Sequence, residues 1–421
     1  MSDWTRRDTV AMLGAAALAP LARFGWRAPV LEPAGPGFRI RTITAGTTLR
    51  DPADMQSLET ALAFLKGAKR MVTEAGYEVQ TIRVATQPLL EEVGHAKRAG
   101  ALTDLQALDR AVTAAGALLS IGPVLAPDGD DPDFAGWAAE LARTTRNVSF
   151  TVRIASPERG ASPGGVTAAG EAMAAIARST AAGLGNFRFA AAANVPAGTP
   201  FFPVAYHRGS DAVAVGVESP PLLAAAFAGA STLADAKQRL KTSLESRLGP
   251  VERLVREAAR RDERAYTGID VSPAPGKDAS IGAAIEALTG VPFGAASTLA
   301  GCAAITDVLK SLKIKTCGYS GLMLPVLEDP VLAQRASEGR FTVRDLLLYS
   351  SVCGTGLDVV PLPGDTGADQ LAALIADVAA LSTKLHKPLS ARLFPVPGRK
   401  VGEVARFSDP YLTDCVVLKA E

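Results

Sequence analysis

The segment Phe38-Arg39-Ile40-Arg41-Thr42-Ile43-Thr44 decides the fold assignment. Its apolar and polar side chains alternate, which is typical of a β-strand. The pattern then predicts a helix over 55–74, capped by Asp51 or Asp54. The chain is again extended over 77–85. This strand, helix and strand predict a parallel or mixed sheet flanked by helices.

The same rhythm continues along the chain. We expect further strands at 117–121, 147–154, 186–193 and 213–218, and further helices at 102–115, 168–182 and 233–261. The last helix is amphipathic, and Gly249-Pro250 should break or kink it. Its charged face is interpreted as solvated rather than as a nucleic-acid patch.

Composition excludes some classes of partner. Hydrophobic residues make up 48% and charged residues 21%, which is ordinary for a globular protein with a sizeable core. The 44 basic and 43 acidic residues give a net charge of +1, which offers no electrostatic attraction for nucleic acid or anionic membranes. Aromatic residues are only 5%, so stacking on bases is not indicated. We therefore expect no nucleic-acid partner.

The N-terminus has the layout of an export signal. Arg6 and Arg7 precede a short apolar run, followed by small residues around Ala17-Leu18-Ala19. The run is shorter than the ~20 residues of a membrane span. The twin arginine resembles a Tat signal, although Thr9 stands where Phe is favoured. We expect residues 1–36 to be a Tat-type signal peptide with a Pro/Gly-rich linker and 37–421 to be one domain. The protein would then be periplasmic, or cytoplasmic if the segment is an ordinary Ala-rich helix.

The cysteines do not define a metal site. Cys302, Cys317, Cys353 and Cys415 form no C-x-x-C pair. With three scattered histidines they give no zinc spacing, so metal ligands stay unassigned.

The segment from Tyr349 to Asp365 has the composition of a functional site. It combines a thiol, hydroxyls, carboxylates and glycines, which let the backbone approach a ligand. Cys353 and Asp358 are its candidate catalytic residues. The alternative for Cys353 is a buried, inert thiol, because no neighbour in the sequence is basic.

Other polar residues follow strand-like runs. His207 is the best acid/base candidate among the histidines. Glu218 and Asp270 each follow an apolar run, and carboxylates at strand ends of an α/β barrel point into its mouth. If they converge with Asp358, they suit a divalent cation or an acid/base pair. The alternative is that they form helix caps and loop salt bridges.

Three residues are candidates for substrate binding. Asn194 should line the same cavity as the carboxylates. Ser280-Ile281-Gly282 opens a helix whose amides can hold an anion, with a simple Ser N-cap as the alternative. Arg392 can bind a substrate carboxylate or phosphate. Glu328-Asp329-Pro330 is interpreted as a turn and cap.

Several long motifs resemble one family. They are Asn194-Val195-Pro196-Ala197-Gly198-Thr199-Pro200-Phe201-Phe202-Pro203, Gly268-Ile269-Asp270-Val271-Ser272-Pro273-Ala274-Pro275, Cys317-Gly318-Tyr319-Ser320-Gly321-Leu322-Met323-Leu324-Pro325, the segment from Tyr349 to Asp365, and Lys387-Pro388-Leu389-Ser390-Ala391-Arg392-Leu393. From about Phe38 onward the chain is similar to domain-of-unknown-function family 711, also called uncharacterised protein family 0210.

The resemblance implies a ten-stranded α/β barrel like that of pyruvate formate-lyase, and a homodimer. It brings no established reaction. In those enzymes a thiol on a central loop works with a glycyl radical, and Cys353-Gly354 resembles that loop. No Arg-Val-x-Gly-Tyr-like motif follows near the C-terminus, so we expect no glycyl radical.

We therefore expect a barrel-like α/β enzyme of hydrolase or lyase type that acts on a small polar or anionic metabolite. A divalent metal ion is a candidate cofactor. The alternative is a non-catalytic periplasmic binding protein on an enzyme-like scaffold. Convergence on one cavity would favour the enzyme. The catalytic candidates are Cys353, His207, Asp270 and Asp358, and the substrate-binding candidates are Asn194, Glu218, Ser280 and Arg392.

Overall fold

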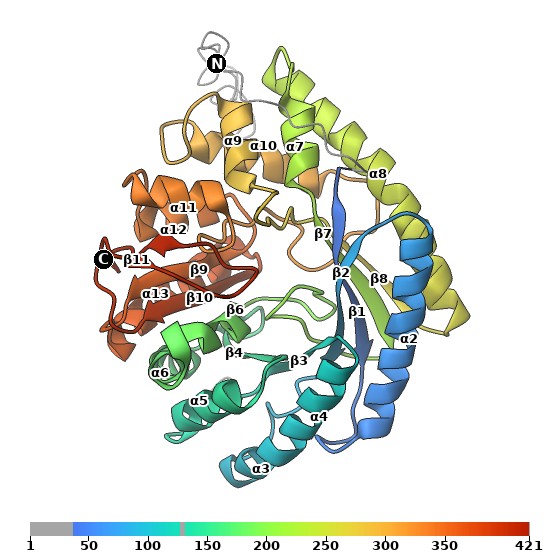
Figure 1. Ribbon diagram of the computed structural model, residues 1–421, viewed down its shortest axis with the longest axis vertical. Coiled ribbons are helices and arrows are strands. Elements are labelled where there is room, and N and C mark those ends of the chain that lie inside the picture. The colour runs from blue at the N-terminus through green and yellow to red at the C-terminus, as the bar shows by residue number, and fades with distance from the viewer. Residues whose placement is uncertain (1–36, 127–130, 421) are drawn as a thin grey trace, which may run out of the picture.

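The strands surround the centre of the molecule and the helices lie outside them (Figure 1). The computed structural model describes residues 37–126 and 131–420. The expected signal peptide and linker, residues 1–36, lie outside the described residues. In the described part of the chain, no helix has the length and apolar character needed to cross a bilayer.

Ten strands form one sheet. Nine of them follow the order β8-β7-β1-β2-β3-β4-β6-β10-β9, and β5 pairs with β4. A separate small sheet consists of β11 and β12. The strand bounds are β1 Arg39–Thr47, β2 Val79–Thr86, β3 Leu118–Pro123, β4 Val148–Ser156, β5 Gly160–Ala161, β6 Phe189–Ala193, β7 Ala212–Glu218, β8 Ala265–Asp270, β9 Gly356–Pro363, β10 Leu389–Val396, β11 Val404–Ala405 and β12 Cys415–Val416.

The sheet is mixed but mostly parallel. Strands β1, β2, β3, β4 and β6 form a parallel block. The pair β7–β8 joins one side of this block antiparallel through β1, and the pair β10–β9 joins the other side antiparallel through β6. The expected α/β class, a mixed sheet surrounded by helices, is confirmed. The likeness to the pyruvate formate-lyase barrel stays a prediction.

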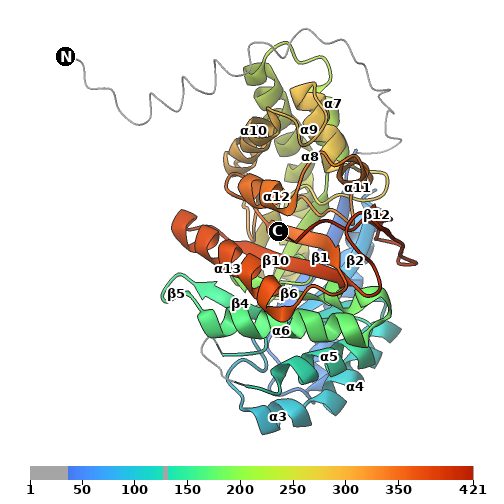
Figure 2. The ribbon, with the colours of Figure 1, turned by 90° about the vertical axis from the view of Figure 1, so that its left-hand side faces the viewer.

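Twelve α-helices and one 3-10 helix are present in the described residues. Helices α5, α6 and α13 lie side by side over the outer face of β4, β6 and β10 (Figure 2). The helix bounds are α2 Met55–Glu74, α3 His95–Gly100, α4 Leu102–Ala114, α5 Phe134–Thr144, α6 Pro163–Ser179, η2 Ala181–Arg188, α7 Pro220–Phe227, α8 Leu233–Arg261, α9 Ile281–Thr289, α10 Thr298–Lys310, α11 Pro330–Ser337, α12 Val343–Ser350 and α13 Ala368–Leu385.

Local signals account for several of these bounds. The side chain of Asp54 caps α2 by accepting from Ser57 N, as the sequence predicted. Helix α6 begins at Pro163, earlier than expected, because a proline fits the first turn, where the missing N–H needs no partner. Ser162 caps this helix by accepting from Gly165 N.

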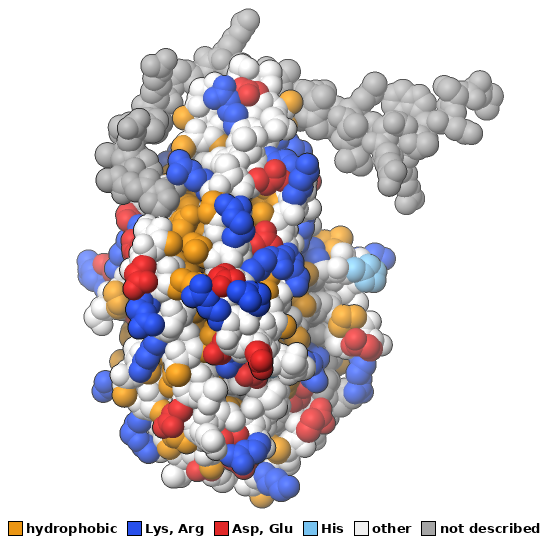
Figure 3. All heavy atoms as spheres, turned by 90° about the vertical axis from the view of Figure 1, so that its right-hand side faces the viewer, with side chains coloured by type: hydrophobic (Ala, Val, Ile, Leu, Met, Phe, Trp, Pro, Cys, Tyr) orange, Lys and Arg blue, Asp and Glu red, His pale blue; other side chains and the backbone are white. Residues whose placement is uncertain are grey.

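The sequence predicted a break or a kink in α8 at Gly249-Pro250, and a break is wrong. The helix runs unbroken from Leu233 to Arg261 with Pro250 inside it. Its buried stripe, including Leu244, Leu248 and Val251, continues across the proline. Burial of this apolar stripe outweighs the one hydrogen bond that a proline removes. Basic and acidic side chains intermingle on the face formed by α2 and α8 (Figure 3).

The two faces of the sheet differ in character, as β6 shows. Phe189, Ala191 and Ala193 belong to the large core between sheet and helices. The intervening Ala190 and Ala192 face inward and contact a separate apolar cluster. This cluster includes residues from the loops after β6 and β8, among them Phe201 and Ala274. Small alanines on the inner face therefore leave room for loops inside the curved sheet.

Candidate functional site

The inner face of the sheet encloses a cavity of about 710 Å³. Side chains from strands on opposite sides of the molecule line it: Arg41 on β1, Arg83 on β2, Asp358 on β9, and Ser390 and Arg392 on β10. Successive side chains of a strand point to opposite faces, so sheet curvature gathers the inward polar side chains at the centre. This arrangement has the size and position of a small-molecule site.

The cavity opens where the parallel strands begin. Leu118 starts β3, Asn147 precedes β4 and Arg188 precedes β6, and all three line the cavity. The exposed Arg146 lies at this rim. We expected the mouth at the opposite, carboxyl ends of the strands. The loop over 194–207 packs there, with Phe201 among the residues that fill the inner face.

Arg83 brings an uncompensated positive charge to the cavity. Its side chain is buried, with 3% exposure, and its guanidinium donates to the Pro200 carbonyl. Nε of Arg83 has no hydrogen-bond partner, and within 37–126 and 131–420 no carboxylate forms an ion pair with it. Burial, with repulsion from Arg41, lowers the pKa of Arg83 to about 9. An anion in the cavity would offset both effects.

Arg188 is the second arginine at the cavity whose pKa falls, to about 10, mainly through desolvation, although its side chain is only half-buried. Arg188 differs from Arg83 because its guanidinium donates hydrogen bonds to three acceptors of the protein. Its guanidinium donates to Thr145 Oγ1 and to the Val148 carbonyl, both at 3.0 Å, and to the Ala142 carbonyl. Arg188 therefore ties η2 to α5 and β4, whereas the Nε of Arg83 has no hydrogen-bond partner.

Two carboxylates flank Arg392. Nε of Arg392 donates to Asp358 Oδ1 at 2.5 Å, and Nη2 donates to Glu328 Oε1 at 2.7 Å. The second Glu328 oxygen accepts from Arg41 Nη2 at 3.2 Å. Burial raises the pKa of Glu328, although Arg392 and Arg41 oppose this. Burial acts against the Arg392 charge, but Asp358 and Glu328 outweigh it and raise the pKa of Arg392. The group links β9 and β10 to β1 across the cavity.

Glu218 supports this group from behind. Its Oε2 accepts from Arg41 Nη1 at 3.1 Å and from Gln80 Nε2 at 2.8 Å, and Arg39 Nε lies 3.3 Å from its Oε1. Glu218 does not line the cavity. Its contacts position Arg41 rather than bind a ligand directly.

Asp270 is a buried anchor for the loop that contains Tyr319. Its carboxylate accepts from Ser272 N and Oγ, from Tyr319 N at 2.8 Å and from Ser320 N at 2.9 Å. Burial raises the pKa of Asp270, and these hydrogen bonds oppose the rise. With its oxygens so engaged, Asp270 holds the loop in place, and Tyr319 itself reaches the cavity.

Ser280 is a helix cap. It accepts from Ala283 N at 2.9 Å at the start of α9. The amides of Ile281 and Gly282, which the sequence offered to an anion, donate to the carboxylate of Asp329 at 2.6 and 3.3 Å. Asp329 also caps α11 by accepting from Leu332 N, so the expected turn and cap at this position is confirmed. An internal carboxylate thus occupies the predicted anion site.

His207 and Asn194 lie apart from the main cavity. The His207 ring packs on Gly46, where an added Cβ would lie 2.3 Å from Nδ1. Its Nε2 lies 3.0 Å from Gly209 O, and burial lowers the pKa of the imidazole. Asn194, in a left-handed backbone conformation (φ 53°), donates to Ser382 Oγ at 2.9 Å. It lines a second cavity of about 450 Å³.

Cys353 is fully buried and does not line the main cavity. Burial raises the pKa of its thiol, and Lys387 opposes the rise. The Lys387 ammonium donates to the carbonyls of Cys353 and of Ser350, the latter at 2.8 Å. Lys387 is therefore a basic group close to Cys353, although no basic residue neighbours Cys353 in the sequence. The ammonium of Lys387 donates to backbone carbonyls of the segment from Tyr349 to Asp365.

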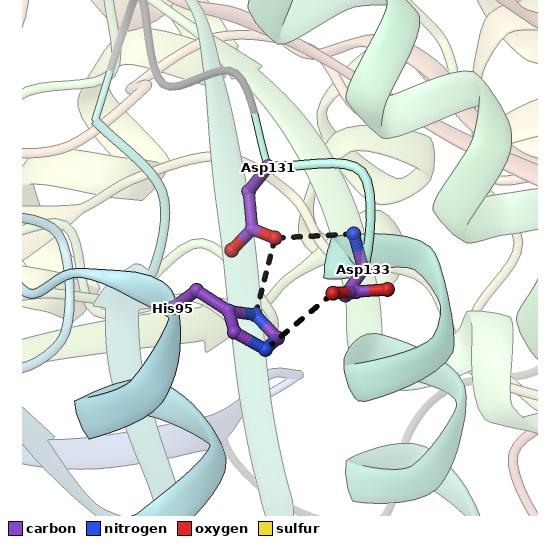
Figure 4. Close-up of side chains that lie close together, drawn as sticks. All are labelled: His95, Asp131 and Asp133. Carbon is purple, nitrogen blue, oxygen red and sulfur yellow. Dashed lines mark hydrogen bonds and ion pairs between the residues drawn. The ribbon is translucent and has the colours of Figure 1, made fainter.

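One group of His and Asp side chains has the spacing of metal ligands in the described residues. His95 Nδ1 lies 3.2 Å from Asp131 Oδ1, and His95 Nε2 lies 3.5 Å from Asp133 Oδ2 (Figure 4). Asp131 also forms an ion pair with Arg98. His95 and Asp133 are exposed, and Asp131 already pairs with Arg98. We therefore interpret the group as an ordinary surface ion pair.

The structure thus brings Asp358 and Arg392 together at the cavity and places the other six candidates elsewhere. It adds Arg83, Glu328 and Arg41, which sequence reasoning missed as site residues. A usable signal existed for Arg83, because a charged side chain between the apolar residues Ile82 and Val84 of the strand Val79–Thr86 is costly to bury unless it is paired or used.

Comparison with known proteins gives a consistent result. The family model described as "Uncharacterised ACR (DUF711)" matches residues 35–408. A UPF0210 protein of Pyrobaculum islandicum is 35% identical over 383 residues, covering 86% of this chain and 83% of its own. UPF0210 proteins of Methanocaldococcus jannaschii and Neisseria meningitidis serogroup C are each 27% identical, with 86–88% of both chains covered.

Proposed function

The chain belongs to the uncharacterised family DUF711, and we propose that it is an enzyme acting on a small anionic molecule bound in the cavity inside the sheet. One observation carries the proposal. Arg83, a buried guanidinium without a carboxylate partner, lines the same cavity as Glu328, a buried carboxyl whose pKa is raised.

The strand arginines at the centre of the cavity are paired unequally. Arg41 lies between Glu218 and Glu328, and Arg392 lies between Glu328 and Asp358. Of these three arginines, Arg83 alone has no anionic partner among the described side chains. A substrate carboxylate or phosphate would supply it, and guanidinium suits both groups.

Glu328 and Asp358 are the acid/base candidates. A carboxyl with a raised pKa retains its proton closer to neutral pH, which suits general acid catalysis. Asp358 is hydrogen-bonded through Arg392 to Glu328, so Arg392 fixes both carboxyl groups relative to the ligand. Proton transfer to or from a bound anion fits a lyase or a hydrolase. A divalent metal ion would have to compete with these arginines for the same carboxylates.

A non-catalytic binding protein is the second candidate. It is favoured because six of the eight expected site residues do not line the cavity, and because both Glu328 oxygens already accept hydrogen bonds from arginines. A carboxylate so engaged is a weaker proton donor or acceptor than a free one. Binding without turnover would be the outcome of that arrangement.

The proposal is tested by identifying the small molecules that stay bound to the protein through purification. The purified protein is denatured, and mass spectrometry identifies small molecules released by the wild type and by Arg83→Met. An anionic compound enriched with the wild type and lost from the variant is the expected result. Incubating that compound with wild type and Glu328→Gln then separates an enzyme, which converts it, from a binding protein, which does not.

Arg110→Met is the matched control, because Arg110 lies exposed on α4. It should retain the compound as the wild type does. If no anion is enriched, or if Arg83→Met retains it equally, the proposed function is wrong.

Export and assembly belong to the same proposal. The twin-arginine segment supports action in the periplasm, and the family resemblance supports a homodimer. Light scattering of the purified protein measures the assembly, and a mass of one chain would contradict the dimer.

A further inference from the structure

Two aromatic rings lie between Arg83, which has no ion-pair partner among the described residues, and Arg392, which has two. The Arg83 Cζ lies 5.6 Å from the centre of the Phe202 ring, and the Arg392 Cζ lies 5.4 Å from the centre of the Phe187 ring. The centres of the two rings are 5.2 Å apart, and the rings are tilted by 53°. The order Arg83, Phe202, Phe187, Arg392 therefore forms a continuous row, and all four residues line the cavity.

The two rings are only partly covered. Phe202 and Phe187 keep intermediate exposure, whereas Phe150 and Phe189 in the outer core are fully buried. Apolar surface next to a buried cation gains stability when a ligand covers it. A partly exposed aromatic pair beside a guanidinium is a surface for a ring that carries a negative charge.

Further apolar side chains extend this surface. Leu184, Phe201 and Met323 line the same cavity. The volume of about 710 Å³ exceeds what phosphate or acetate alone would fill and lies in the usual range for drug-sized ligands.

We propose that the anion bound in this cavity carries an aromatic ring, with its carboxylate or phosphate on Arg83 and its ring against Phe202 and Phe187. The proposal rests on the proposed function and specifies its substrate class.

Isothermal titration calorimetry of the full chain tests it with two pairs of probes. Phenylacetate is compared with acetate, and phenyl phosphate with inorganic phosphate. Each aromatic probe should bind roughly tenfold or more tightly than its partner, because a buried ring adds apolar area and ring contacts. Arg83→Met should weaken binding of all four probes.

Phe202→Leu and Phe187→Leu separate the ring from the charge. Either variant should reduce the aromatic preference several-fold while leaving acetate and phosphate binding unchanged. Two positions are used because Phe202 precedes Pro203 in a packed loop, and thermal unfolding verifies that each variant is folded.

The outcomes distinguish this inference from the proposed function. Equal affinity for aromatic and simple anions, or a preference that survives both leucine variants, overturns the aromatic class and leaves the anion site standing. Absence of binding by every probe overturns both.

Discussion

Burial pushes Arg83 and Glu328 in the same chemical direction, toward loss of charge. It lowers the pKa of Arg83 to about 9 and raises the pKa of Glu328. An anionic ligand would favour the charged form of Arg83 and the protonated form of Glu328. At the scale of single residues, the cavity combines Arg83, whose Nε has no hydrogen-bond partner, with Glu328, whose two oxygens are both held by arginines.

The stability of Glu328→Gln should depend on pH differently from that of the wild type. The pKa of Glu328 is raised above 4.5 in the folded protein, so above pH 4.5 the folded protein keeps a proton that the unfolded chain releases. The stability from this proton is present in full below pH 4.5 and is lost as pH rises through the raised pKa. A tenfold difference in proton affinity between the folded and unfolded chains corresponds to about 1.4 kcal/mol.

Calorimetry from about pH 4.5 to 7 measures this effect. The Tm of Glu328→Gln relative to the wild type should rise with pH, because glutamine does not titrate. Exposed Gln56→Ala on α2, which changes no titratable group, is the control and should shift Tm by the same amount at every pH. A difference that is constant or falls with pH would contradict the raised pKa.

Cys353 should behave as a packing residue. Its thiol is fully buried and burial raises its pKa, so little thiolate forms at neutral pH. Cys353→Ala should lower the free energy of unfolding by roughly 1 kcal/mol and leave ligand binding and turnover intact. Denaturant titration and iodoacetamide labelling of the native protein measure both points. Rapid labelling at Cys353, or loss of turnover in the variant, would instead make the thiol the nucleophile.

At the scale of elements, two loops cross inside the sheet. The segment that contains Gly321 and the segment from Tyr349 to Asp365 meet at Gly354, whose N donates to Leu322 O at 3.0 Å. A Cβ added at Gly354 would lie 2.3 Å from the Gly321 Cα. Both positions therefore require glycine, because the two backbones touch there. This contact brings Asp358 and Glu328 to the same cavity.

Gly354→Ala should destabilise the protein by about 2 kcal/mol or more, because the clash is with backbone that cannot move aside easily. Gly67→Ala is the matched control, since Gly67 lies inside α2 with nothing within 4 Å of an added Cβ. It should stabilise by about 0.5–1 kcal/mol. Chemical denaturation measures both, and similar effects of the two substitutions would refute the crossing.

At the scale of the whole molecule, the curvature of the sheet creates the site. Arg392 and Arg41 lie on strands that β2, β3, β4 and β6 separate in the sheet order, yet both contact Glu328. A flat sheet would place them far apart. The cavity is consequently a property of the complete sheet and of no single strand pair.

The proposed export would depend on a segment outside the described residues. Replacing Arg6 and Arg7 by lysine should block export, because a Tat-type signal depends on the arginine pair. Cell fractionation measures the periplasmic share of the protein, and Arg23→Lys in the same segment serves as the control. Undiminished export of the double variant would exclude the Tat-type signal.

Much of the fold could be predicted because its signals are local. Alternation identified β1, and the cap at Asp54 with the helical periodicity identified α2. The site could be predicted only in part. Asp358 stood out as a carboxylate of the segment from Tyr349 to Asp365, and Arg392 as a cation that can bind a carboxylate or phosphate. Glu328 was instead assigned to a turn because Asp329-Pro330 follows it.

The sequence by itself determined many of the strands and helices, the family and the mixed α/β class, since periodicity, caps and motifs act over short distances. Only the tertiary structure decided which polar residues meet. It buried His207 against Gly46, engaged Asp270 as an internal hydrogen-bond acceptor, and brought Arg83 and Glu328 to one cavity. The physical reason is that sheet curvature and loop crossing join residues far apart in the chain, such as Arg41 and Glu328, which are 287 positions apart. No local pattern encodes those contacts.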